Sequence, residues 1–170
     1  MKYFEVFEIP PALALDPRDL EKRFYALSRK LHPDLRRNPA DRAEAEEATA
    51  VLNDAYRSLK DPIQRAEYVL KHHGFDIGEQ GTKNVPPELL EEMFELNLML
   101  EEMQEGTACS LGPWVEVSDK LNQIDEELKT RFSEWDAGHQ HETLGAIRGI
   151  LNRRKYITNL IAKANVSDRI

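Results

Sequence analysis

The tripeptide His32-Pro33-Asp34 constrains the fold of this chain most strongly, because it separates two segments with helical periodicity. Proline has no backbone N–H and disfavours the α conformation in the residue before it, so we expect the first helix to stop at His32. Upstream, Asp16 is suited to cap a helix that Pro17 opens at its first position. The sequence therefore predicts a helix from Pro17 that ends in an exposed turn.

This first helix is predicted to have two unlike faces. On a wheel of 100° per residue, its apolar residues lie within roughly 60° of one another. They are Leu20, Phe24, Leu27 and Leu31. Lys22 and Arg29 lie about 180° away on the same wheel, and Arg23 and Lys30 flank the apolar stripe. One face should therefore be core, while the other is cationic.

A second apolar stripe with helical spacing lies between Pro39 and the pair Asp61-Pro62. It comprises Ala48, Val51, Leu52, Ala55, Tyr56 and Leu59. Two amphipathic helices joined by a short connection usually pack side by side in opposite directions. We therefore expect an antiparallel hairpin whose loop contains His32.

These residues resemble the J domain of DnaJ-type co-chaperones and, among them, the HscB family that serves bacterial iron–sulfur cluster assembly. The matching residues are the short segment Tyr3-Phe4 to Phe7, the basic helix with its His32-Pro33-Asp34 turn, Asn53-Asp54-Ala55-Tyr56 before Leu59, Arg65-Ala66-Glu67-Tyr68, Leu70 and His73-Gly74-Phe75-Asp76. The resemblance implies an all-α, L-shaped protein. Its parts would be a J domain (1–75), a linker (76–86) and a C-terminal helical scaffold-binding domain (87–170), built as a three-helix bundle.

The C-terminal half also has helical periodicity of its own. A third segment runs from about Glu88 to Gln104, and a fourth is opened by Pro113 and closed by Gly138. The stripe of the fourth is Val117, Leu121, Ile124, Leu128, Phe132 and Trp135; that of the fifth is Leu144, Ile147, Ile150, Leu151, Ile157, Leu160, Ile161 and Ala164. Three amphipathic helices with short connections indicate a small bundle.

Charge and cysteine content exclude several classes of protein. The net charge of −8 falls within residues 76–106, which hold one Lys and nine Asp or Glu. An acidic segment repels phosphate backbones and suits a basic protein surface, so we expect no nucleic-acid partner. We also expect no membrane span. Cys109 is the single cysteine, which favours a reducing compartment and a cytoplasmic location.

The third segment carries more apolar residues than one buried face needs. Leu89, Met93, Leu96, Leu100 and Met103 form the core stripe. Leu90, Phe94 and Leu98 form a second stripe among glutamates, which indicates a docking patch. The alternative is packing against the first domain. The resemblance assigns scaffold binding to Leu90, Phe94, Glu95 and, on the last helix, Tyr156; the wheel alone adds Leu98.

The candidates for catalysis or metal binding are few. His72 and His73 are adjacent, so on a helix they point about 100° apart and a capping role beside Gly74 is the better interpretation. His139 and His141 are expected at the start of a surface helix, and Cys109 in a loop. We therefore expect no catalytic residue, no metal and no cofactor. A small enzyme or metal protein that uses the histidines is kept as an alternative.

The resemblance implies a protein that activates a partner ATPase of the HscA or DnaK type and delivers an IscU-type iron–sulfur scaffold protein to it. Arg23, Arg29 and Lys30 would attract an acidic ATPase surface, and the His32-Pro33-Asp34 turn would act on hydrolysis, with Asp34 engaging an arginine of the chaperone. Two further alternatives stay open at this point. One is a J-domain co-chaperone with a different client, and the other is an interaction domain without an ATPase partner.

Overall fold

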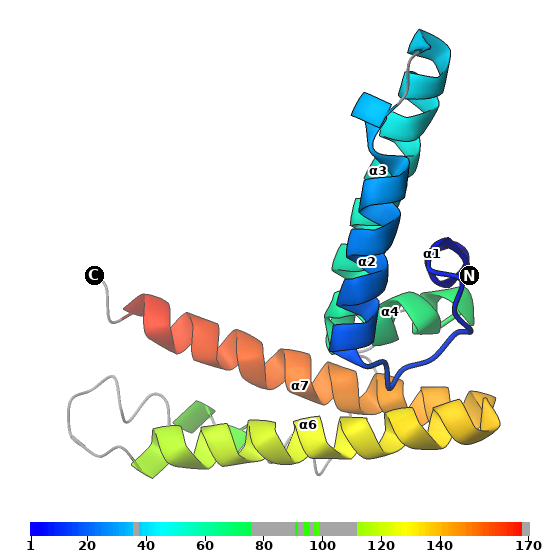
Figure 1. Ribbon diagram of the computed structural model, residues 1–170. Coiled ribbons are helices and arrows are strands. Elements are labelled where there is room, and N and C mark those ends of the chain that lie inside the picture. The colour runs from blue at the N-terminus through cyan, green and yellow to red at the C-terminus, as the bar shows by residue number, and fades with distance from the viewer. Residues whose placement is uncertain (36–37, 76–90, 92–93, 96, 99–111, 168–170) are drawn as a thin grey trace.

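The computed structural model describes residues 1–35, 38–75, 91, 94–95, 97–98 and 112–167, and all of its regular elements in these ranges are helices. In chain order they are α1 (Lys2–Val6), α2 (Pro17–Leu31), the 3₁₀ turn η1 (Pro33–Leu35), α3 (Pro39–Lys60), α4 (Pro62–His72), α6 (Gly112–Gly138) and α7 (His141–Ser167). Figure 1 shows α2 and α3 side by side as a hairpin that stands away from α6 and α7. The molecule is therefore L-shaped and all-α, as predicted.

Three helices of the N-terminal half begin in the same way. Asp16, Asn38 and Asp61 are each followed by a proline, and each side chain accepts a hydrogen bond from a backbone N–H of the first turn, at 2.8 to 3.1 Å. The cap satisfies an orphan N–H group, and proline at the first position has no N–H that needs a partner. The predicted start at Pro17 and the predicted end at His32, which is the C-cap of α2, are both confirmed.

The hairpin is held by the stripes that the periodicity indicates. Leu20 of α2 is buried, and Phe24 stacks on Tyr56 of α3 with ring centroids 4.1 Å apart. Leu52, Ala55 and Leu59 of α3 are fully buried.

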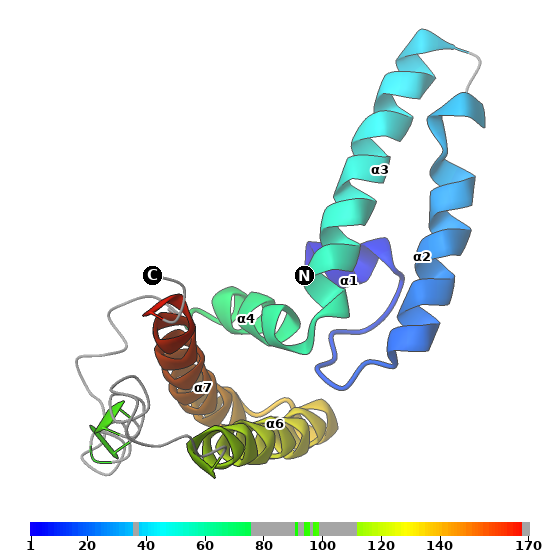
Figure 2. The same cartoon turned by 90° about the vertical axis from the view of Figure 1, so that its left-hand side faces the viewer.

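The second arm of the L is the antiparallel pair α6 and α7, which Figure 2 shows nearly end-on. The predicted stripe of α6 is buried except for Leu121, which is half-buried, and Trp135 is fully enclosed. The predicted end of α6 at Gly138 is confirmed, and the helix begins at Gly112, one residue before the predicted Pro113. Ala164, the last member of the α7 stripe, has a side chain outside the described part, as do Cys109 and the linker 76–86.

The two arms meet around the loop between α1 and α2. The backbone N–H groups of Leu13 and Ala14 donate to the two carboxylate oxygens of Asp136 on α6, at 2.7 and 2.8 Å. The Leu13 carbonyl accepts from the Nε of Arg65 on α4, at 2.9 Å. Buried residues of both arms form one continuous core across this junction.

Candidate functional site

The His32-Pro33-Asp34 turn lies at the end of the hairpin arm, where α2 stops and η1 begins. The carbonyl of His32 accepts a hydrogen bond from the backbone N–H of Leu35 at 3.1 Å. The Nδ1 atom of the His32 ring accepts one from the backbone N–H of Asp34 at 3.2 Å. Because Nδ1 is the acceptor in this contact, a neutral ring carries its proton on Nε2, directed away from the turn. The turn therefore fixes the ring with its own backbone and leaves one nitrogen for a partner.

Both polar side chains of the turn are open to solvent. The side chains of His32 and Asp34 are 54% and 74% exposed, and the guanidinium of Arg42 on α3 lies 4.0 Å from the Asp34 carboxylate. At this exposure and separation the Arg42 contact is weak. Asp34 can thus accept hydrogen bonds from an arginine of another protein.

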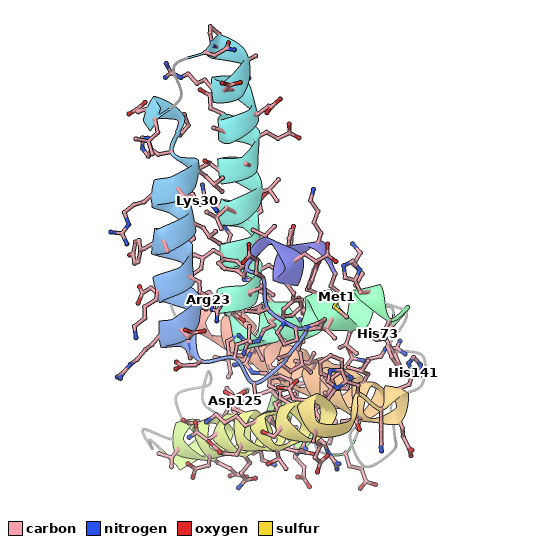
Figure 3. All side chains as sticks on the ribbon, turned by 45° about the vertical axis from the view of Figure 1, so that its right-hand side comes forward. Met1, Arg23, Lys30, His73, Asp125 and His141 are labelled. Atoms are coloured by element: carbon pink, nitrogen blue, oxygen red, sulfur yellow. The ribbon has the colours of Figure 1, made fainter. Side chains whose placement is uncertain are left out.

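The cationic face predicted for α2 is on the surface. Lys22, Arg23, Arg29 and Lys30 are all exposed. Figure 3 places Arg23 nearer the junction and Lys30 nearer the turn on the same helix. Arg23 pairs with Asp19 at 2.8 Å, and Arg29 Nε donates to the Tyr25 carbonyl at 3.3 Å. Both of these contacts are made within α2.

Two apolar residues of this arm were not singled out from the sequence. Tyr25 is 56% exposed on α2, and Leu35, directly after the tripeptide, is 66% exposed. Tyr25 lies outside the apolar stripe of its helix, and that offset was the available signal. Large exposed apolar side chains beside cations are typical of partner-binding surfaces.

A second candidate surface lies on the other arm. Glu91, Phe94, Glu95, Asn97 and Leu98 are helical, and Phe94 and Leu98 are 64% and 43% exposed. These two side chains are therefore open to solvent, whereas packing against the J domain would have covered them. Leu90 and the core stripe predicted for this segment lie outside the described residues.

Tyr156 of α7 is brought to this surface by the fold. Its ring is half-buried and packs against the core, while its hydroxyl accepts a long hydrogen bond of 3.5 Å from the Asn97 side-chain amide. Residues 59 positions apart in the chain thus meet at one place. Their roles in binding stay predictions.

The histidines at the junction contact aromatic rings. His72 Nε2 lies 2.9 Å from the Tyr68 hydroxyl, His73 packs edge-on against Trp135, and His141 stacks on Phe75. His73 is exposed as a residue, but the partial burial of its ring lowers its pKa, and the neighbouring His141, His72 and His139 lower it further. Among the described residues, no three His, Cys, Asp or Glu side chains are grouped as metal ligands would be.

Every helix in the described ranges is either too short or too polar to cross a lipid bilayer.

Comparison with known proteins agrees with this architecture. The DnaJ domain family matches residues 2–68. The co-chaperone protein HscB homolog of Vibrio vulnificus strain YJ016 is 43% identical over 110 residues, which cover 63% of this chain and 64% of that protein. The match thus spans slightly less than two thirds of that relative. The homolog of Aliivibrio salmonicida is 32% identical over 163 residues, covering 94% of this chain and 92% of that protein.

Solved structures give the same result. Chaperone HscB from Vibrio cholerae has a TM-score of 0.66 at 30% identity and covers 99% of both chains. Human co-chaperone protein HscB, at 24% identity, shares the fold with a TM-score of 0.73 over 98% of this chain and 81% of that one. This is a family of co-chaperones and not of enzymes. With a DnaJ domain at its N-terminus and a near full-length relative at 32% identity, the chain belongs to the HscB family of J-domain co-chaperones.

Proposed function

We propose that this protein stimulates ATP hydrolysis by an HscA- or DnaK-type chaperone and delivers an IscU-type iron–sulfur scaffold protein to it in the cytoplasm. One observation carries the proposal. The His32-Pro33-Asp34 turn is exposed at the free end of the hairpin, with both polar side chains open to solvent.

The hairpin arm attracts the chaperone by charge and carries the turn that stimulates its ATP hydrolysis. The exposed cations of α2 (Arg23, Arg29 and Lys30) raise the rate of encounter with an acidic ATPase surface, because their charge acts beyond contact distance. The turn then docks with the His32 ring and the Asp34 carboxylate presented to the chaperone. The chemistry of ATP cleavage belongs to the partner.

The second arm supplies the client. Phe94 and Leu98 offer apolar area, and the surrounding acidic segment suits a basic protein surface. The two surfaces lie on different arms of the L, so both partners can bind at once (Figure 1). Simultaneous binding raises the effective concentration of the scaffold at the ATPase without any catalysis by this chain.

The first test removes the imidazole of the turn. In the His32→Gln variant we expect stimulation of the chaperone ATPase to be abolished while scaffold binding and helicity are unchanged, because the exposed ring supports no core. A coupled ATPase assay measures this, and His72→Gln is the matched control on α4 of the same domain. Full stimulation by His32→Gln would remove the proposed mechanism.

The second test truncates Leu90 and Phe94, two members of the second apolar stripe predicted for the third segment. A Leu90→Ala/Phe94→Ala double variant should weaken scaffold binding by about 2–3 kcal/mol, as truncation of interface anchors does, with ATPase stimulation in the absence of scaffold unchanged. Titration calorimetry measures the affinity. Leu35→Ala, on the other arm, is the control. Unchanged affinity in the double variant would show that the scaffold protein does not bind through these residues.

A further inference from the structure

The hydrogen bond between Asn97 and Tyr156 is the contact that joins the described part of the third helical segment to α7 by side chains. Asn97 Nδ2 donates to Tyr156 Oη at 3.5 Å. Both residues are half-buried, in contrast with the neighbouring Phe94, which is 64% exposed. The contact thus lies at the border between packed interior and open surface.

Helical geometry fixes which side of the apolar pair faces Tyr156. At 100° per residue, Leu98 lies about 40° from Phe94 in one direction, and Asn97 lies about 60° from Phe94 in the other. Glu95 lies about 100° from Phe94 on the Leu98 side. Asn97 and Glu95 therefore border the apolar pair on opposite sides, and the Tyr156 hydroxyl lies at the border next to Phe94.

The hydrogen bond from Asn97 is a directional contact to the Tyr156 hydroxyl. The Tyr156 ring packs against the core, and an apolar contact of this kind makes no directional bond to the hydroxyl at the outer end of the ring. A hydrogen bond to the hydroxyl orients the Tyr156 ring. The asparagine amide can donate this bond at every physiological pH because it does not titrate. Ordering a side chain before binding lowers the entropy that association costs.

We infer that Asn97 is a positioning residue of the client surface, whose side-chain amide holds the Tyr156 hydroxyl so that the ring extends the Phe94–Leu98 patch. The inference rests on the proposed function, since it assigns Asn97 a part in binding the scaffold protein. Asn97 acts through Tyr156, so removing either partner of the hydrogen bond should have the same effect on affinity.

The test is a double-mutant cycle in the full-length protein with the IscU-type scaffold as titrant. Asn97→Ala and Tyr156→Phe should each weaken binding roughly 3- to 10-fold, the range expected for one hydrogen bond. The double variant should be no weaker than the weaker single variant, because both changes break the same contact. Asn97→Gln keeps the amide and should recover part of the loss, while Asn122→Ala, at an exposed position on α6, should bind normally.

A spectroscopic measurement separates positioning from a general loss of structure. The NMR signals of the Tyr156 ring in the free protein should shift or broaden in Asn97→Ala, with far-UV circular dichroism and ATPase stimulation unchanged. Affinity of Asn97→Ala within twofold of wild type, or multiplicative losses in the double variant, would overturn the inference.

Phe94→Ala distinguishes this failure from failure of the proposed function. If Phe94→Ala weakens scaffold binding and Asn97→Ala does not, the surface stands and only the positioning role is wrong. If neither variant changes the affinity, or the scaffold does not bind the wild-type protein, the client surface itself is wrong and the inference falls with it.

Discussion

Arg65 shows how much of the junction depends on one side chain. Only 3% of it is exposed, and its guanidinium donates to the Leu13 carbonyl at 2.9 Å and to the Leu59 carbonyl at 2.6 Å. Burial lowers the pKa of Arg65, and the nearby Asp136 and Asp61 oppose that shift, so the charge is kept inside the protein. Arg65 thus provides a hydrogen-bond donor both for a carbonyl at the end of α3 and for a carbonyl of the α1–α2 loop.

We expect Arg65→Met to reduce the free energy of unfolding by about 2–4 kcal/mol, because it keeps the apolar stem but leaves two buried carbonyls without a donor. Urea denaturation followed by circular dichroism measures the change. Arg57→Met, at an exposed position on α3, should change stability by less than about 0.5 kcal/mol. Equal stability of the two variants would contradict the role given to Arg65.

At the scale of elements, the end of α4 packs against the start of the α6–α7 turn through aromatic and imidazole rings. His73 is the C-cap of α4, followed by Gly74 with φ +81°, and its ring lies 6.0 Å from that of Trp135. The ring of His141 lies 4.6 Å from Phe75. Figure 3 shows His73 and His141 at the same end of the molecule.

This arrangement predicts a pH dependence of stability. Because burial and the neighbouring histidines lower the pKa of His73 in the folded protein, folding favours its neutral form. The contribution of His73 is therefore complete above the unfolded pKa of about 6.5 and is lost as pH falls through the folded value. The urea midpoint should fall between pH 7 and pH 5, and it should fall less in His73→Gln.

His32→Gln is the control for this pH measurement, since the turn lies at the far end of the hairpin, away from the junction (Figure 1). An identical pH dependence in His73→Gln and wild type would show that protonation of His73 does not change the stability of the fold.

At the scale of the whole molecule, the angle between the arms depends on contacts between distant parts of the chain. The Asp136 carboxylate accepts from the N–H groups of Leu13 and Ala14, while Arg65 holds the Leu13 carbonyl. Leu13 itself is fully buried. The α1–α2 loop is therefore fastened to α4 on one side and to α6 on the other.

We expect Asp136→Ala to widen the distribution of angles between the arms, because it leaves two loop N–H groups without their protein acceptor. Spin labels at exposed Ala43→Cys on α3 and Glu127→Cys on α6, in a Cys109→Ser background, report the inter-arm distance by pulsed electron resonance. The distance distribution should broaden in Asp136→Ala and be unchanged in Asp119→Ala. An equally narrow distribution in both would show that the apolar core alone fixes the angle.

The sequence alone determined the helices that have local signals. The start of α2 at Pro17, its end at His32, and the close of α6 at Gly138 follow from proline, cap residues and glycine, which act through the backbone of neighbouring residues. The buried stripes follow from periodicity, because a helix places every third or fourth residue on one face. The exposed turn was predictable for the same local reasons.

The tertiary structure decided what those helices bring together. Leu13 meets Asp136 across 123 positions and Asn97 meets Tyr156 across 59, and no periodicity encodes such pairs. The sequence left open whether the Phe94–Leu98 stripe packs on the J domain, and the exposure of both side chains decided this for the described residues. The physical reason is that local propensity fixes backbone angles within one helix, whereas contacts between helices depend on how their side chains pack in three dimensions.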